Sequence, residues 1–138
     1  MMDVDDFKIF NDTYGHLDGD NVLKEIGRII HTFIRSSDSA FRYGGEEFVV
    51  IMPETNGNSA HTVAERIRQG FKQHVFITHN KSPEQLTLSL GLAQFTPGED
   101  ARTLVKRADF NMYCAKKNGK DQIYFSNQDP DLQKAIGF

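Results

Sequence analysis

The chain has 138 residues and a net charge of −3, with 38% hydrophobic and 25% charged residues. This length fits one domain with a sizeable core, and the composition is ordinary for a soluble globular protein. The small negative charge gives no overall attraction to nucleic acid or an anionic membrane, the longest apolar run is too short to span a bilayer, and no secretory signal opens the chain.

The first predicted element is a strand of about four residues at MMDV, which is too short to be a good centre for a sheet. Residues 5–20, DDFKIFNDTYGHLDGD, are polar and rich in Asn, Asp and Gly. We therefore predict a loop or turn-rich connection there rather than a continuous helix. Apolar residues then recur at helical spacing, which predicts an amphipathic helix over residues 20–34.

Two strands follow, over residues 39–43 and 47–52, and they flank the pair Gly44-Gly45 as in a hairpin. The second strand, EFVVIM, lacks alternation and is predicted to be covered on both faces. Residues 53–59 are predicted to form a loop, and the apolar positions from 60 to 71 predict a second helix.

Leucines alternate with small residues over 87–93, which predicts another strand. A third helix is predicted over 104–115, ending near Asn118-Gly119, and a short last strand over 123–125. The helix contains the only cysteine, Cys114, so no internal disulfide forms and a reducing cytoplasm is the expected location.

This order of elements is the split βαββαβ pattern of ferredoxin-like domains, extended by one helix and one strand. The predicted fold class is α/β (α+β), with a central, mainly antiparallel sheet flanked by helices. One domain is expected over residues 1–125, and residues 126–138 are predicted to be a polar tail that frays.

Carboxylates gather near the start of the chain, at Asp3, Asp5, Asp6, Asp12, Asp18 and Asp20. A ferredoxin-like sheet could bring Asp3, at the end of the first strand, beside the hairpin that bears Glu46 and Glu47. Hard oxygen ligands from two elements, completed by substrate phosphates, suit Mg²⁺ and metal-assisted phosphoryl or nucleotidyl transfer. The alternative is an acidic loop that is merely solvated.

Basic residues gather later, at Lys116, Lys117 and Lys120 around a helix C-terminus. They either stabilise the helix dipole or form a local phosphate clamp. The polar loop over 5–20 likewise either faces a nucleotide or only connects two elements. Arg35 and Asp38, three residues apart, would in isolation be an ordinary pair at a helix end.

Six motifs settle between these alternatives when they are taken together: DVDDFKIFNDTYGHLDGDNVL, RSSD, RYGGEEF, AERIR, LSLGLA and ADFNMYCAKKNGKDQI. Their order and spacing resemble the GGDEF domain of the diguanylate cyclase family, from residue 3 to about residue 125. The resemblance implies condensation of two GTP to cyclic di-GMP and two pyrophosphates, on a homodimer with one substrate per subunit. It also implies Mg²⁺ or Mn²⁺ as cofactor, cytoplasmic location, and no contact with nucleic acid or membrane.

The resemblance assigns the metal to Asp3 and Glu46, helped by the Val4 carbonyl, with Glu47 as a second metal-directed carboxylate. Gly44-Gly45 would let the backbone approach the nucleotide without a Cβ clash. These acids and glycines form the catalytic signature that the resemblance implies.

Asn11 and Asp20 match the positions that read guanine, and a carboxylate suits the donor edge that adenine lacks. The positions that match phosphate-binding residues are Phe7, Lys8, Lys116 and Lys120. Lys120 departs from the usual arginine and so loses a bidentate donor fork, and Asp121 stands where asparagine is usual.

RSSD matches the inhibitory RxxD site, so Arg35 and Asp38, with Arg66 from the next helix, are expected to bind the product. The family usually has a helix, most of the first strand and a DxLTGLxNRR-like loop before Asp3, and these are missing from this sequence. We therefore describe the domain as N-terminally truncated and expect low stability and turnover of the chain as given.

Two other functions compete with an active cyclase. A catalytically weak GGDEF domain would bind cyclic di-GMP or GTP as a signalling module, but retention of Asp3, Glu46, Glu47 and Lys116 favours the enzyme. A different nucleotidyl transferase is disfavoured by Asn11 with Asp20 and by the absence of a broad basic stripe.

Overall fold

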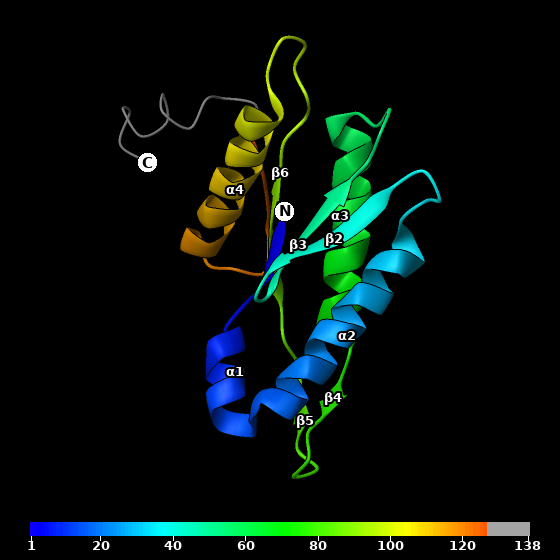
Figure 1. The fold of residues 1–138 in the computed structure, drawn as a ribbon. Coiled ribbons are helices and arrows are strands. Elements are labelled where there is room, and N and C mark those ends of the chain that lie inside the picture. The colour runs from blue at the N-terminus through cyan, green and yellow to red at the C-terminus, as the bar shows by residue number, and fades with distance from the viewer. Residues whose placement is uncertain (127–138) are drawn as a thin grey trace.

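The computed structural model describes residues 1–126, so the predicted tail from 127 to 138 lies outside the described residues. The central sheet has the strand order β2-β3-β1-β6-β7 (Figure 1). Its strands are β1 (Met2–Val4), β2 (Ser39–Gly44), β3 (Glu47–Ile51), β6 (Leu88–Leu92) and β7 (Ile123–Phe125). Neighbours pair antiparallel except β6 and β7, which are parallel. The predicted fold class, a ferredoxin-like α+β sheet with one appended strand, is confirmed.

Four helices accompany the sheet: α1 (Phe7–Tyr14), α2 (His16–Phe33), α3 (Gly57–Gln73) and α4 (Ala101–Lys117). Helices α2 and α3 lie on one side of the sheet and α4 on the other (Figure 1). None of the described helices combines the length and apolarity that crossing a bilayer requires.

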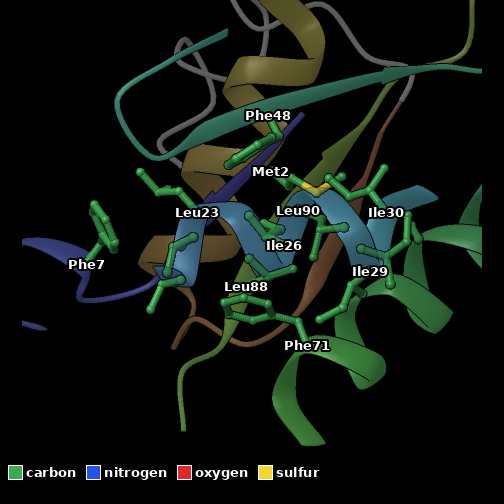
Figure 2. Close-up of a cluster of buried hydrophobic side chains, with 14 of the residues drawn as sticks. Met2, Phe7, Leu23, Ile26, Ile29, Ile30, Phe48, Phe71, Leu88 and Leu90 are labelled. Atoms are coloured by element: carbon green, nitrogen blue, oxygen red, sulfur yellow. The ribbon is translucent and has the colours of Figure 1, made fainter. Parts of the chain in front are cut away.

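The core fills the space between the sheet and helices α2 and α3. Figure 2 shows Met2, Phe48, Leu88 and Leu90 of the sheet meeting Ile26 and Ile30 of α2 and Phe71 of α3, all buried. The apolar residues of α2 recur every three or four positions, so one stripe of the helix faces the sheet. This packing fixes α2 against β1 and β3, the strands that carry the predicted acids.

On the opposite side of the sheet, α4 packs unusually close to β6. A Cβ added at Gly91 would lie 2.1 Å from both the Ala108 carbonyl oxygen and the Met112 nitrogen. Asn111 Nδ2 donates to the Leu92 carbonyl at 2.6 Å. This close contact requires a glycine at position 91. It fixes how near α4 lies to β6, and the last turn of α4 carries Lys116.

The prediction of a loop over residues 5–20 is wrong for most of that segment. Residues Phe7–Tyr14 form α1, and α2 begins at His16, four residues before the predicted start. Phe7 and Phe10, one helical turn apart, are both buried, and this apolar face stabilises α1 despite its polar composition. Gly15, with φ of 88°, separates the two helices.

Two expectations about the sheet are also wrong. The short β1 is its central strand, because β3 and β6 pair with its two edges and the Met1 ammonium donates to the Gly91 carbonyl at 2.8 Å. Strand β3 is not covered on both faces: Phe48 is buried but Ile51 is 54% exposed. The missing alternation in EFVVIM therefore reflects a strand that is only partly covered.

A second, two-stranded sheet of β4 (Phe76–Ile77) and β5 (Pro83–Glu84) was not predicted. Its strands have two residues each, too few for any periodicity to show in the sequence. This hairpin lies beside the N-terminal part of α2, away from the central sheet (Figure 1).

Candidate functional site

A cavity of about 460 Å³ lies between α1, α2 and the turn that joins β2 to β3. The predicted site residues on its walls are Phe7, Lys8, Asn11, Asp20, Gly45 and Glu46. The structure thus brings residues from two separate motifs, DVDDFKIFNDTYGHLDGDNVL and RYGGEEF, to one opening. Asp12, named only as a member of the acidic cluster, also lines the cavity, together with His16, Leu23 and Arg42, none of which was predicted as a site residue.

The predicted metal-binding acids meet where β1 and β3 pair. Asp3 lies directly opposite Glu47 in the ladder, and the Val4 N–H donates to the Glu46 carbonyl at 3.4 Å. Asp3 is 4% exposed, while both glutamates are half-buried. The proximity that the fold class suggested for Asp3 and the hairpin is therefore present.

The two carboxylate oxygens of Asp3 have different surroundings. Oδ2 lies 2.7 Å from the Lys116 ammonium, and Oδ1 is buried without a hydrogen-bond partner among the described residues. Burial raises the pKa of Asp3 to about 6, Lys116 opposes that rise, and the charges of Glu46 and Glu47 add to it. An ionised Asp3 is thus disfavoured here, and a cation beside Oδ1 would relieve the cost.

Whether these residues fit a divalent metal depends on how many ligands the protein must supply. Among residues 1–126, no group of three or more His, Cys, Asp or Glu side chains is arranged as a finished metal site. Mg²⁺ commonly takes only one or two carboxylates and completes its shell with water and substrate phosphates. The orphaned Asp3 Oδ1, the Glu46 carboxylate and the Val4 carbonyl are oxygen donors of that kind, so the residues present fit such an ion.

At the other end of the cavity, Asn11 packs tightly against α2. A Cβ added at Gly19 would lie 1.8 Å from Asn11 Oδ1, so only glycine leaves room for this side chain. Asn11 Oδ1 is itself buried without a hydrogen-bond partner in the described part of the chain. Asn11 therefore has a buried amide oxygen that no described group satisfies, while the exposed Asp20 lies on the cavity wall.

The β2–β3 turn contains two glycines, and the backbone conformation favours glycine at only one of them. Gly45 has φ of 43°, which favours glycine, and its carbonyl accepts from Arg42 Nε at 2.8 Å. A Cβ at Gly44 would meet nothing closer than Glu47 Oε2 at 3.9 Å. Packing within the protein therefore does not explain Gly44, and its open space is available to a ligand.

Two of the three lysines predicted to bind phosphates, Lys116 and Lys120, are ion-paired. Lys116 lies on Asp3, and Lys120 Nζ lies 2.6 Å from Asp6 Oδ1, just before α1. Asp121, predicted as a departure from asparagine, pairs with Arg68 and with Lys72, and this joins its loop to α3. A carboxylate at position 121 thus stabilises the structure through its ion pairs with two basic residues of α3.

Residues of the predicted inhibitory site lie away from the cavity. The Arg35 N–H donates to Asp38 Oδ2 at 2.9 Å, and the Asp38 N–H donates to the Arg35 carbonyl at 3.0 Å, which leaves the Arg35 guanidinium exposed. Arg66 is exposed on α3, and within residues 1–126 no hydrogen bond or ion pair joins it to Arg35 or Asp38.

Asp5 is a buried residue that accepts hydrogen bonds from segments around the candidate site. From the sequence it was identified only as a member of the acidic cluster. It is 3% exposed and accepts from the Thr87 and Ser89 hydroxyls at 2.7 and 2.6 Å and from the Asp121 N–H at 3.1 Å. These bonds tie the segment after β1 to β6 and to the loop that carries Lys120.

Comparison with known proteins identifies close relatives. Residues 1–122 match the family described as diguanylate cyclase, GGDEF domain. Diguanylate cyclase A of Treponema denticola is 40% identical over 136 residues, and the match covers 98% of this chain and 36% of that protein. The response regulator PleD of Caulobacter vibrioides is 41% identical over 125 residues, which cover 89% of this chain and 28% of PleD.

Solved structures of similar fold belong to the same family of domains. The GGDEF domain of DgcB from Caulobacter crescentus, in complex with c-di-GMP, has a TM-score of 0.86 and 32% identity, covering 90% of this chain and 74% of that one. The active GGEEF domain of a diguanylate cyclase from Vibrio cholerae has a TM-score of 0.84 and 32% identity, covering 92% and 80%. The chain spans 36% or less of the two full-length relatives named above.

Proposed function

The chain belongs to the GGDEF domain family of diguanylate cyclases, and from this premise we propose that it condenses two GTP into cyclic di-GMP with release of two pyrophosphates. The observation that carries the proposal is the junction of β1 and β3. There the buried Asp3 meets Glu46 and Glu47 beside a cavity that Asn11 and Asp20 also line. Of the three acids, Glu46 lines the same cavity as Asn11 and Asp20, and the volume of that cavity suits a nucleotide.

Guanine binds at the α1–α2 end of this cavity. The Asp20 carboxylate accepts hydrogen bonds from the donor edge that distinguishes guanine from adenine. Asn11 adds an amide whose Oδ1 has no partner in the described structure. The phosphates extend toward Phe7, Lys8 and Gly45, where the backbone is open to them.

Asp3, Glu46 and the Val4 carbonyl would hold Mg²⁺ or Mn²⁺, and Glu47 would add negative charge to the same site. The ion, when bound, supplies Lewis-acid polarisation of the phosphate oxygens and of the attacking hydroxyl. Lys116 keeps Asp3 oriented through their ion pair and contributes positive charge beside the phosphates.

Joining two nucleotides requires two cavities, so we propose that catalysis takes place between two copies of the chain, each with one GTP. Cyclic di-GMP then inhibits by binding to Arg35, Asp38 and Arg66. The exposed Arg35 guanidinium supports this step, because Asp38 is engaged by the Arg35 backbone and not by its side chain. A planar fork of donors remains available for a guanine edge or a phosphate.

The test is chromatographic measurement of cyclic di-GMP formed from GTP with and without Mg²⁺, for the unaltered chain and for Glu46→Ala. Glu54→Ala, an exposed glutamate in the loop after β3, is the matched control. We expect Glu46→Ala to lose at least about a hundredfold in turnover, since it removes a ligand of the ion that stabilises the transition state. Equal turnover in Glu46→Ala and Glu54→Ala would remove the metal assignment.

A receptor of cyclic di-GMP or GTP is the second candidate, and one observation favours it. Lys116 and Lys120 are already neutralised by Asp3 and Asp6, so neither cation is free to hold a phosphate until its ion pair opens. Saturable cyclic di-GMP binding by calorimetry, together with absence of product at any metal concentration, would select the receptor.

A further inference from the structure

The corner between α1 and α2 has two faces. On one face Asn11 and Asp20 line the nucleotide cavity. Tyr14, the last residue of α1, and Asp18, in the first turn of α2, instead contact the β4–β5 hairpin. The base-reading residues and the hairpin contacts therefore lie on the same short piece of backbone, whose two helices meet at Gly15.

Two contacts, more than 60 residues apart in sequence, fasten this corner to the hairpin. The Tyr14 hydroxyl donates to Glu84 Oε1 at 2.5 Å, and the Ser82 hydroxyl donates to the same oxygen at 2.9 Å. Asp18 Oδ2 accepts from the His79 N–H at 3.1 Å and lies 2.7 Å from His79 Nδ1. Each helix of the corner is thus held by one side chain of the hairpin.

On the side of the helices both contacts start from packed positions, whereas the His79 side chain is 67% exposed. Asp18 is 8% exposed, and hydrogen bonds from His79 hold its pKa below the ordinary value. Tyr14 packs against the buried ring of Phe10 with centroids 4.9 Å apart, and its hydroxyl holds the pKa of Glu84 below the ordinary value. The carboxylates of Asp18 and Glu84 are therefore ionised acceptors, which make stronger hydrogen bonds than neutral ones.

The corner leaves the base-reading residues little room for adjustment. Asn11 fits against α2 only because Gly19 has no Cβ. A change in the angle between α1 and α2 would move Asn11 relative to Asp20, and both must meet one base. Small displacements of positioned groups reduce substrate use strongly.

We propose that His79 and Glu84 are positioning residues for the guanine end of the cavity. Through Asp18 and Tyr14, they hold the α1–α2 corner at the angle at which Asn11 and Asp20 read one base. The inference rests on the proposed function, because it concerns how the same cavity selects its nucleotide. It assigns a role in nucleotide selection to a hairpin that contributes no wall residue to the cavity.

The experiment measures kcat and KM for GTP and for ATP in Glu84→Ala, His79→Ala and Tyr14→Phe. His61→Ala is the control, since it removes an exposed histidine of α3 that no hydrogen bond or ion pair among the described residues joins to Tyr14, Asp18 or the hairpin. We expect KM for GTP to rise about tenfold in Glu84→Ala with kcat changed by less than about twofold, and the preference for GTP over ATP to fall. Glu84→Gln should restore KM, because its amide oxygen still accepts from Tyr14 and Ser82.

Tyr14→Phe keeps the ring packed on Phe10 and removes only the hydroxyl, so it tests the contact without unfolding the corner. Unaltered KM and unaltered GTP preference in Tyr14→Phe, Glu84→Ala and His79→Ala, with normal cyclic di-GMP production, would overturn the inference and leave the proposed function intact. Absence of cyclic di-GMP from the unaltered chain would instead overturn the proposed function. In that event GTP affinity measured by calorimetry on the same variants decides the role of the hairpin.

Discussion

Replacement of Asp3 by Asn should make the protein more stable and less active at neutral pH. Asp3 is almost completely buried, its Oδ1 has no partner among the described residues, and its pKa is raised to about 6, chiefly by burial. Asparagine has nearly the same shape and stays neutral at every pH. The substitution therefore removes the cost of an ionised group while it also removes a metal ligand.

The magnitude follows from the pKa. Its ordinary value is 3.8, so the rise to about 6 is worth about 3 kcal/mol at roughly 1.4 kcal/mol per pH unit. That value already includes the attraction of Lys116. Because the folded state binds the proton more tightly than the unfolded state, the unaltered protein loses this stability as pH rises from about 4 to 6. Above pH 6 Asp3→Asn should be more stable by up to about 3 kcal/mol, or roughly 10 °C in Tm.

The assay is urea unfolding of both proteins from pH 4 to pH 8 with EDTA present, so that no divalent ion offsets the charge of Asp3. The difference between the two free energies of unfolding isolates Asp3, because carboxylates with lowered pKa, such as Glu65, contribute equally to both proteins. We expect this difference to be close to zero near pH 4 and to reach its maximum above pH 6. Mg²⁺ with GTP should then stabilise the unaltered protein more than Asp3→Asn.

Either of two results would refute this reasoning. If Asp3→Asn is less stable than the unaltered protein at pH 7.5, the Lys116 ion pair outweighs the burial of Asp3. A difference that does not vary with pH would show that the Asp3 carboxyl titrates with an ordinary pKa in the folded protein.

The other predictions concern the α4–β6 contact, base choice and product inhibition. Gly91→Ala should destabilise the fold by about 3 kcal/mol or more in urea unfolding, because its Cβ would press on the backbone of α4. Gly27→Ala, where nothing lies within 4 Å, should instead stabilise α2 by about 0.5–1 kcal/mol. Asp20→Ser should lower the ratio of kcat/KM for GTP over ATP, and an unchanged ratio would mean that guanine is read elsewhere. Arg35→Ala should relieve inhibition by cyclic di-GMP while sparing the initial rate, and calorimetry showing undiminished cyclic di-GMP affinity would contradict that role.

The family and the order of most elements along the chain could be predicted because they depend on patterns local to the sequence. Helix α2 follows from its apolar period, the β2–β3 turn from two adjacent glycines, and the ferredoxin-like order from the succession of elements. The resemblance then named residues of the cavity, such as Asn11 and Asp20, from their motif alone.

Local sequence patterns gave wrong predictions for elements whose structure depends on packing or pairing with segments distant in the sequence. Residues 7–14 are too polar to be identified as a helix by composition, yet Phe7 and Phe10 find a core to pack against. Three residues of β1 form the centre of the sheet, because strands from elsewhere in the chain supply partners on both edges. A backbone with both edges paired is stable at a length that would fail alone.

Some chemical features of the candidate site could likewise be predicted from the sequence, and others depend on the tertiary structure. The prediction that Asp3, Glu46 and Lys116 share one site came from motifs in the sequence. The burial that raises the pKa of Asp3, the ion pair that Lys116 makes with it and the hairpin that fastens the α1–α2 corner depend on the tertiary structure. A pKa and an ion pair are set by distances of a few ångströms, and residues more than 100 positions apart reach such distances only when the whole chain folds.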